Sequence, residues 1–314
     1  MKKRAFTLVE LLVVVAIIAL LVGLLLPALA KAQQTAKTVK DSNQIKQIHT
    51  AMVGKANETK GGKLPLPSMI NRLAYNGQQI PGEGDEDYTR NTTPAMLSAC
   101  VAQQLFNTDI LVGPTEVNPV ITPYINYNYA QYRPAGDTYW DPGLLANVDA
   151  APGSGACHTS YAHQVLCGLR MQQHWKNNLD STRPHMATRG CDNGRVTGDT
   201  YEQSPTLRLH GGLKSWEGNV CYADTHMEFV ETFRPDGCFY ECGNFNGGNL
   251  TKDNLFACAG STAGSPEFTG AGCLNPVSHP WSGGDAMLGI HYTPQSASLA
   301  KTTVAPRYDR LDNQ

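Results

Sequence analysis

The chain has 314 residues, of which 41% are hydrophobic, 8% aromatic and 17% charged, and its formal net charge is −2. A length of this order allows one large domain or about two ordinary ones. The near balance of charge excludes a strongly basic nucleic-acid binder, because neutralising phosphates requires an excess of Lys and Arg. The ordinary apolar fraction excludes a wholly disordered chain. The 30 Gly and 19 Pro predict many turns and long connections rather than a helical bundle.

A basic cluster and a long apolar segment open the chain. Residues 2–4 are Lys, Lys and Arg, and an apolar stretch then runs from Phe6 to about Ala30. A helix over residues 8–30 would be ~35 Å long, enough to cross a hydrocarbon core of ~30 Å. The basic cluster predicts that the N-terminus stays in the cytoplasm and that the rest of the chain is exported.

An ordinary secretory signal peptide is the main alternative for this segment. Against it, the apolar stretch is longer than the core of a signal peptide. Glu10 is the ionisable side chain inside the stretch. A charge there costs ~2.5–3.5 kcal/mol, so an intramembrane carboxylate indicates a function. The plainer alternative is that Glu10 lies near the helix end and reaches the membrane surface.

The sequence KKRAFTLVELLVV, residues 2–14, closely resembles the class III leader and helix start of type IV pilins and type II secretion pseudopilins. The resemblance implies cleavage by prepilin peptidase between Ala5 and Phe6, followed by N-methylation of Phe6. Gly is the usual residue before the cut, and Ala5 is an accepted variant. Glu10 stands where this family keeps a glutamate. The resemblance covers only the first 30 to 55 residues.

Glu10 gains a role in assembly from this resemblance. After cleavage, the amine of Phe6 can pair with Glu10 of a neighbouring subunit inside an apolar bundle of helices. An unpaired buried carboxylate is costly, whereas a paired one specifies register. We therefore expect Glu10 to select the correct axial step of an incoming subunit.

Pro27 interrupts the apolar helix. It removes one helical hydrogen bond and clashes with the preceding turn, so we expect a kink or local melting just before it. Gly23 weakens the same stretch. Pilin-like helices often carry Pro at this place and unwind there in filaments. The alternative is that the transmembrane helix simply ends at Pro27.

Residues 31–60 keep a helical pattern but become amphipathic. Their apolar stripe predicts a stem helix that packs on a globular head; it comprises Ala32, Ala36, Val39, Ile45, Ile48 and Met52. Six Lys against Asp41 and Glu58 give this segment a net charge of +4, whereas the 16 basic and 24 acidic side chains of residues 61–314 give −8. A basic stem beneath an acidic head would favour contacts between subunits, although exposed charge pairs are individually weak.

Gly61 and Gly62 end this helix, and the prolines at 65 and 67 prevent its continuation. The elements expected beyond it are a helix over 95–106, a strand over 125–132, a helix around 161–175, and two strands, 219–224 and 226–230, joined by a tight turn. The expected fold is therefore α+β: a pilin-like long N-terminal helix, transmembrane and then amphipathic, packed on an antiparallel β-sheet head with long loops. The expected segments are a leader peptide (1–5), a transmembrane assembly helix (6–30), an amphipathic stem (31–60), a globular head (61–234) and a cysteine-containing C-terminal extension (235–314).

A second resemblance lies in the head. Many large pilin-like proteins of Gram-negative bacteria carry His-Gly-Gly, a spacer, and Asn-Val-x-Phe/Tyr-Ala-Asp-Gly-His-Val. The matching residues here are His210, Gly211, Gly212, Asn219, Asp224 and His226. The spacer between His210 and Asp224 is 13 residues, longer than the usual nine, and Thr225 replaces the turn Gly. Because Asp-Gly favours a type I′ turn through positive φ, Asp224-Thr225 must use another turn or accept strain.

All nine Cys lie beyond the apolar segment, which indicates an oxidising compartment and disulfide bonds in a loop-rich head. The odd number leaves at least one thiol unpaired or paired between subunits. The candidate disulfides join Cys238 to Cys242, or join each of these to the neighbouring loop that holds Cys258 and Cys273.

Metal binding is the competing use of such residues. Cys238-x3-Cys242 and the His residues of the head show no recognised zinc spacing. His210, Asp224 and His226 either converge on a cation or form a hydrogen-bonded clasp of the hairpin, and the clasp is favoured. Pseudopilin heads can bind calcium through acidic loops, and the candidate ligands here are Asp85, Glu86 and Asp87. No EF-hand pattern is present, so calcium stays unplaced, and no other cofactor is expected.

No G-x-S-x-G, H-E-x-x-H, Walker or G-x-G-x-x-G motif occurs, so we do not expect an enzyme. The resemblance implies a structural subunit of a type IV pilus-like or type II secretion pseudopilus filament. Its expected partners are copies of itself, prepilin peptidase, an inner-membrane assembly platform and ATPase, and other minor pilins, but no nucleic acid. The precursor is expected in the inner membrane and the filament in the periplasm or outside a Gram-negative cell.

Two other functions remain open. The large loop-rich head and the 88 residues after His226 are compatible with a minor tip pilin or adhesin whose head binds a ligand. A lipid-anchored or hydrolytic cell-surface protein that merely shares the signal would require that Ala5-Phe6 is not the processing site.

Overall fold

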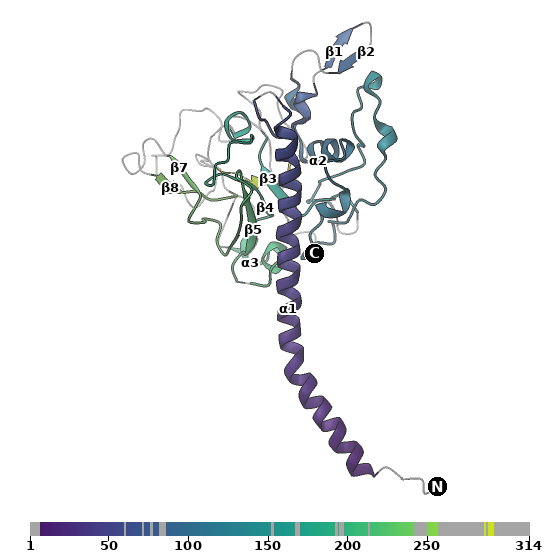
Figure 1. Cartoon of the computed structure of the whole chain (residues 1–314), viewed down its shortest axis with the longest axis vertical. Helices are drawn as coiled ribbons and strands as arrows, with labels where there is room; N and C mark the ends of the chain where they lie inside the picture. Colours follow the sequence, from purple (N-terminus) through teal and green to yellow (C-terminus); the bar gives the residue numbers. More distant parts are fainter. Residues whose placement is uncertain are drawn as a thin grey trace.

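One long helix links an exposed N-terminal rod to a globular head. The computed structural model of the chain describes residues 7–59, 61–70, 72–75, 78–81, 86–151, 154–166, 170–191, 194, 198–212, 214–241, 250–256, 286 and 288–291. Figure 1 shows the helix, α1 (Leu8–Ala56), with its C-terminal half enclosed by the head and its N-terminal half standing clear of it. The structure confirms the predicted α+β fold, in which a long N-terminal helix packs on an antiparallel sheet.

The helix α1 joins the expected assembly and stem segments without a break. It passes through Pro27, so neither the expected local melting nor a helix end occurs there. Figure 1 shows a bend in α1 between the head and the N-terminus, as expected when proline removes a helical hydrogen bond. Beyond Ala56, Gly61 and Gly62 adopt φ values of 85° and 64°, which divert the chain from the helix axis.

The head contains a five-stranded antiparallel sheet in the order β6-β5-β4-β3-β9. Its strands are β3 (Tyr161–Gln164), β4 (Pro184–Thr188), β5 (Gly218–Tyr222), β6 (Met227–Val230) and β9 (Leu288–Gly289). The helix α1 packs on β4 and β5. Side chains alternate along β5: Cys221 joins the core beside α1, whereas Val220 and Tyr222 join an aromatic core on the opposite face. The sheet therefore separates two apolar cores.

The first core lies between α1, the sheet and α2 (Thr93–Ala102), and it contains Ile45, Ile48, Met52, Met96, Leu97, Trp175 and Met186. The second core contains Trp216, Phe233, Leu255 and Phe256. Both Leu288 of β9 and the Leu255–Phe256 pair belong to residues 235–314. The C-terminal extension thus supplies an edge strand and core side chains to the head.

Shorter elements complete the described chain. The strands β1 (Arg72–Tyr75) and β2 (Gln78–Pro81) form one hairpin, and β7 (Phe239–Glu241) and β8 (Leu250–Lys252) form another. The remaining helical elements are α3 (Asp199–Glu202), a π-helical turn at Arg170–His174 and 3₁₀ turns at Pro67–Met69, Tyr88–Arg90, Thr108–Leu111, Tyr129–Gln131, Pro134–Gly136 and Pro205–Arg208.

Two of the predicted elements of the head are wrong, and their local chemistry explains why. The segment 125–132 is not a strand: it contains the 3₁₀ turn Tyr129–Gln131, which the side chain of Asn128 caps by accepting from Ala130 N at 3.0 Å. The expected helix around 161–175 begins instead with β3, and among the described residues of this segment the helical ones are Arg170–His174. A short, fully buried strand and a buried helix have similar apolar patterns.

Two other predictions are confirmed. The helix expected over 95–106 is α2, which Thr92 caps by accepting from Ala95 N at 3.3 Å. The hairpin of β5 and β6 is present, and Thr225 in its turn adopts φ 72°. This turn therefore holds a β-branched residue in the left-handed region that favours glycine.

The assembly helix and its anchor in the head

The described chain begins at the N-terminal turn of α1, where Thr7 and Glu10 form a capping box. The Glu10 carboxylate, through Oε2, accepts from Thr7 N at 2.9 Å and from Thr7 Oγ1 at 2.7 Å. Glu10 N in turn donates to Thr7 Oγ1 at 3.3 Å. The positive end of the helix dipole favours a carboxylate at this position. Glu10 is exposed, and both of the bonds that its carboxylate accepts from Thr7 use Oε2 rather than Oε1.

Apolar side chains cover the exposed part of α1 from Leu8 to Leu29. Every described large hydrophobic residue in this range is at least 45% exposed. Within the described residues, one helix is long and apolar enough to cross a membrane, and it is α1. A continuous apolar surface of this size marks contact with lipid or with other proteins. No described part of the head covers it, because burial along α1 begins at Asp41.

A buried carboxylate marks the point where α1 enters the head. Asp41 is 1% exposed and accepts hydrogen bonds from three strands of the sheet. Tyr161 of β3 donates to Oδ1 at 3.0 Å, while Thr188 of β4 and Asn219 of β5 donate to Oδ2 at 3.2 and 3.1 Å. The Nε2 atom of His210 lies 3.5 Å from Oδ2. We call Asp41, Tyr161, Thr188, His210 and Asn219 the Asp41 cluster.

Two members of the cluster also bind the preceding turn of the helix. Asn219 Nδ2 donates to Thr38 O at 3.2 Å, and His210 Nδ1 lies 3.2 Å from Thr38 Oγ1. The loop before His210 adds a third contact, because Gln34 Nε2 donates to Leu209 O at 3.3 Å. The head therefore binds one side of α1 over about two helical turns through hydrogen bonds of polar groups.

Two glycines allow this close approach. Gly211 adopts φ 95°, so the chain turns sharply directly after His210. Gly113 lies against the Asp41 carboxylate, and a Cβ atom there would collide with Oδ1. No pattern in the sequence pointed to Gly113. Asp41, in contrast, can be recognised in the sequence as a charged residue on the apolar stripe of the stem, four residues before Ile45 and seven before Ile48.

The residues of the His-Gly-Gly motif separate into two places. His210 and Asn219 join the Asp41 cluster, whereas Asp224 and His226 lie at the tip of the β5–β6 hairpin. There His226 N donates to Asp224 Oδ1 at 3.1 Å, and the His226 ring stacks on Tyr222 at 4.3 Å. The structure therefore does not bring His210, Asp224 and His226 together, and a clasp within the turn involves only the last two. No cluster of three or more His, Cys, Asp or Glu suited to a metal ion occurs in the described part of the chain.

Several predicted residues lie outside the described residues: Ala5, Phe6, Asp85, Cys242, Cys258 and Cys273. Cys238 is buried in the second core. The processing site and the disulfide pairs therefore stay predictions. Of the other calcium candidates, Glu86 pairs with Lys63 at 3.2 Å, and Asp87 caps the 3₁₀ turn that begins at Tyr88. Calcium also stays a prediction.

Buried histidines occupy the contact between α1, α2 and the sheet. His49 of α1 and His185 of β4 are 2.9 Å apart, Nε2 to Nδ1, and burial lowers the pKa of His49 to about 4 and that of His185 to about 3. His163 of β3 bonds to Thr93 Oγ1 at 2.8 Å, and burial lowers its pKa to about 4. The His291 ring lies 4.8 Å from that of His163 at a tilt of 57°, and burial lowers the pKa of His291 as well. These four imidazoles are therefore neutral near pH 7.

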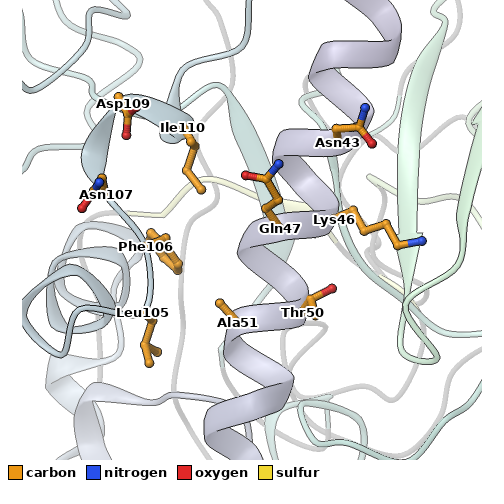
Figure 2. Close-up of a pocket in the computed structure, with 10 residues that line it drawn as sticks. All are labelled: Asn43, Lys46, Gln47, Thr50, Ala51, Leu105, Phe106, Asn107, Asp109 and Ile110. Carbon is orange, nitrogen blue, oxygen red and sulfur yellow. The ribbon is translucent and has the colours of Figure 1, made fainter.

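An open groove of about 680 Å³ runs beside the stem. Figure 2 shows α1 forming one wall and the segment after α2 forming the other. The lining residues are Asn43, Lys46, Gln47, Thr50, Ala51, Leu105, Phe106, Asn107, Asp109 and Ile110. Asp109 is the carboxylate among them, and Lys46 points away from the facing segment (Figure 2).

A comparison with protein families identifies the N-terminal segment. The prokaryotic N-terminal methylation motif matches residues 1–26, which include the basic cluster, Ala5, Phe6, Glu10 and most of the exposed apolar helix. No curated protein and no solved structure matches the chain significantly. The matched motif is one of structural subunits rather than of enzymes. The match covers residues 1–26 of the 314, so this N-terminal segment, at the start of a long exposed helix, is similar to that of type IV pilin-like and pseudopilin-like proteins.

Proposed function

We propose that this protein is a structural subunit of a type IV pilus-like or type II secretion pseudopilus filament. Prepilin peptidase would cut after Ala5, Phe6 would be N-methylated, and the subunit would polymerise through α1. The observation that carries this proposal is the methylation motif at the start of a helix whose apolar half the described head leaves uncovered.

The exposed half of α1 can be covered in two ways. In the precursor, lipid acyl chains would surround it, and an assembly platform and ATPase of the inner membrane would extract the subunit. In the filament, the same segment of other copies would replace the lipid. Because lipid tails are as apolar as the helices, this exchange supplies little hydrophobic driving force. Polar contacts and close packing must therefore select the docked position.

Glu10 is the polar group suited to that selection. Its Oε2 accepts both bonds from Thr7, and Oε1 would accept from the amine of Phe6 in an adjacent copy. A charged pair between helices in an apolar surrounding is costly when either partner is missing, so a misplaced subunit would be disfavoured. The Asp41 cluster complements this role, because it holds the head at one position on α1. The docked position of the helix then also sets the position of the head.

The test uses filaments sheared from cells and purified. We expect intact-mass measurement to show a subunit that has lost its first five residues and gained one methyl group. Glu10→Ala should stay in the membrane fraction and be absent from filaments, whereas Glu58→Ala, an exposed Glu in the stem, should assemble normally. Normal filaments from Glu10→Ala would refute the register role, and a soluble periplasmic chain cut after residue 30 would refute the filament role.

A minor tip subunit is the second candidate, since the head carries an exposed aromatic segment that assembly through α1 does not require. Abundance separates the two: a major subunit is the dominant band of a filament preparation, whereas a tip subunit is present in trace amounts.

A further inference from the structure

An uncharged segment, residues 117–132, crosses the surface of the head and is rich in tyrosine. It contains four Tyr, three Asn and one Gln, but no Asp, Glu, Lys, Arg or His. Ile125 is 84% exposed, Tyr129 51% and Tyr132 59%. In Figure 1 this part of the chain lies along the outer rim of the head, on the side of β1 and β2. We call residues 124–132 the tyrosine segment.

The tyrosine segment is held in place from within the head. The Asp141 carboxylate, through Oδ2, accepts from Tyr124 OH and from Asn128 N, both at 2.8 Å. Tyr127 OH donates to Ser98 O of α2 at 2.7 Å. The inner tyrosines therefore fix the backbone to the head, while Tyr129 and Tyr132 keep about half of their surface in solvent.

The two exposed rings are three residues apart in the sequence. Tyr129 opens a 3₁₀ turn, and Tyr132 directly follows it with an extended backbone. Tyr127 packs edge-on against Tyr129 at 4.8 Å, and Tyr139 supports Tyr132 at 6.3 Å. Aromatic contacts of this kind limit the freedom of the exposed rings, so little entropy would be lost on binding.

We propose that the tyrosine segment binds a neutral polysaccharide. A sugar ring presents polarised C–H groups that are attracted to the negative face of an aromatic ring. Its hydroxyl groups pair with amides, which both donate and accept; Gln131 directly precedes Tyr132, and Asn126 lies three residues before Tyr129. Tyrosine with asparagine is also the composition of loops that bind by rigid aromatic contact and adaptable hydrogen bonds.

The lack of charged residues in the segment 117–132 indicates which class of polymer it can bind. Nucleic acids and acidic polysaccharides require several Lys or Arg for their anionic groups; residues 117–132 contain neither, and a single exposed cation, Arg133, follows them. Two exposed rings three residues apart can contact different sugar units of an extended chain. The proposal deepens the tip-subunit candidate, but it requires only that the head is exported and does not depend on assembly through α1.

The test uses the full-length chain in detergent micelles and affinity electrophoresis through gels that contain dextran, soluble starch or hydroxyethylcellulose, with alginate as the acidic comparison. We expect retardation by at least one neutral polymer and none by alginate. The double variant Tyr129→Ala/Tyr132→Ala should bind at least tenfold more weakly, whereas Tyr129→Phe should retain most of the binding. Leu145→Ala/Leu179→Ala removes exposed apolar side chains elsewhere and should bind as the wild type does.

Two results would overturn the proposal. One is the absence of retardation by every neutral polymer, or retardation that the double tyrosine variant leaves unchanged. The other is a double variant that folds with an unchanged melting temperature but no longer forms filaments, which would make the segment a contact between copies. The Glu10→Ala chain should bind polysaccharide normally, so failure of assembly and failure of sugar binding are distinguishable.

Discussion

His210 of the head and Asp41 of the stem helix lie 3.5 Å apart, Nε2 to Oδ2, and both side chains are at most 1% exposed. A buried carboxylate is tolerated only when its oxygens are hydrogen-bonded. The strands β3, β4 and β5 each supply one donor, so the position of α1 along the sheet is specified by groups that cannot shift without losing a partner. In a filament assembled through α1, this contact would fix the position of the head relative to the helix.

Asn219→Ala tests how strongly this contact holds the helix. The substitution removes hydrogen bonds to Thr38 O and to Asp41 Oδ2, which keeps Thr188 as a donor. We expect a loss of ~2–3 kcal/mol of unfolding free energy, because two hydrogen bonds are lost and one of them is made to a carboxylate. Urea denaturation of the chain in micelles measures it. Asn126→Ala, in an exposed loop, is the control, and an effect no larger than that of the control would contradict the role of Asn219.

Gly113→Ala tests the close approach of a loop to Asp41. A Cβ at this position collides with the carboxylate, so the Asp41 cluster must open. We expect a destabilisation of ~1–3 kcal/mol, the usual effect of overpacking. Gly54→Ala is a matched control: Gly54 lies in α1 with open space around it, and the substitution should stabilise the helix by ~1 kcal/mol. Equal melting temperatures for the two variants would show that the carboxylate moves aside at no cost.

The helix was predictable from the sequence because its evidence is local. A long uncharged apolar run and the Thr7–Glu10 capping pair specify α1 without reference to the rest of the chain. The β5–β6 hairpin was predictable for the same reason, since alternation and a turn lie within a dozen residues. In contrast, Tyr161–Gln164 is buried along its whole length, and a run of this kind does not distinguish the centre of a sheet from a buried helix.

The Asp41 cluster could be predicted only in part. The motif named both His210 and Asn219, but it led us to expect His210 beside Asp224 and His226. Their observed partner is more than 160 residues earlier in the chain, and long-range contacts leave no periodic pattern. Thr188 and Tyr161 are common types of residue at unremarkable positions. Asp41 on an otherwise apolar stripe was the signal of a buried polar contact, and Gly113 offered none.

The stability of the head should fall as the pH falls below about 6.5. Burial lowers the pKa of His49, His163 and His185 to between about 3 and 4, so the unfolded chain binds protons at a higher pH than the folded one. The free energy of unfolding therefore has its full value above ~6.5, the pKa of histidine in the unfolded chain. It decreases as the pH falls toward 4, by ~2 kcal/mol per histidine at pH 5. Thermal unfolding between pH 7.5 and 4.5 measures the slope.

Two variants separate this cause from general acid denaturation. His185→Gln removes one buried imidazole. Between pH 6.5 and 5 it should reduce the slope of unfolding free energy against pH by the amount that corresponds to uptake of about one proton. His226→Gln, which removes a side chain that is 42% exposed, is the control for the loss of a histidine at the surface. A melting temperature that is constant from pH 6.5 to 5 would show that protonation of these histidines is not coupled to unfolding.

Thr225→Gly should stabilise the protein, although it removes a larger side chain. Thr225 adopts φ 72° in the turn between β5 and β6, where its backbone N donates to Tyr222 O at 2.9 Å. A β-branched residue in the left-handed region costs ~1–2 kcal/mol, which glycine avoids, while the added freedom of glycine in the unfolded chain offsets part of the gain. We expect a net increase of ~1 kcal/mol, measured as a higher urea midpoint with an unchanged slope. Gly211→Ala imposes the reverse change at φ 95° and should lower the midpoint by a similar amount. If Thr225→Gly lowered it instead, the hydroxyl and methyl groups of Thr225 would have to contribute more to the turn than its backbone strain costs.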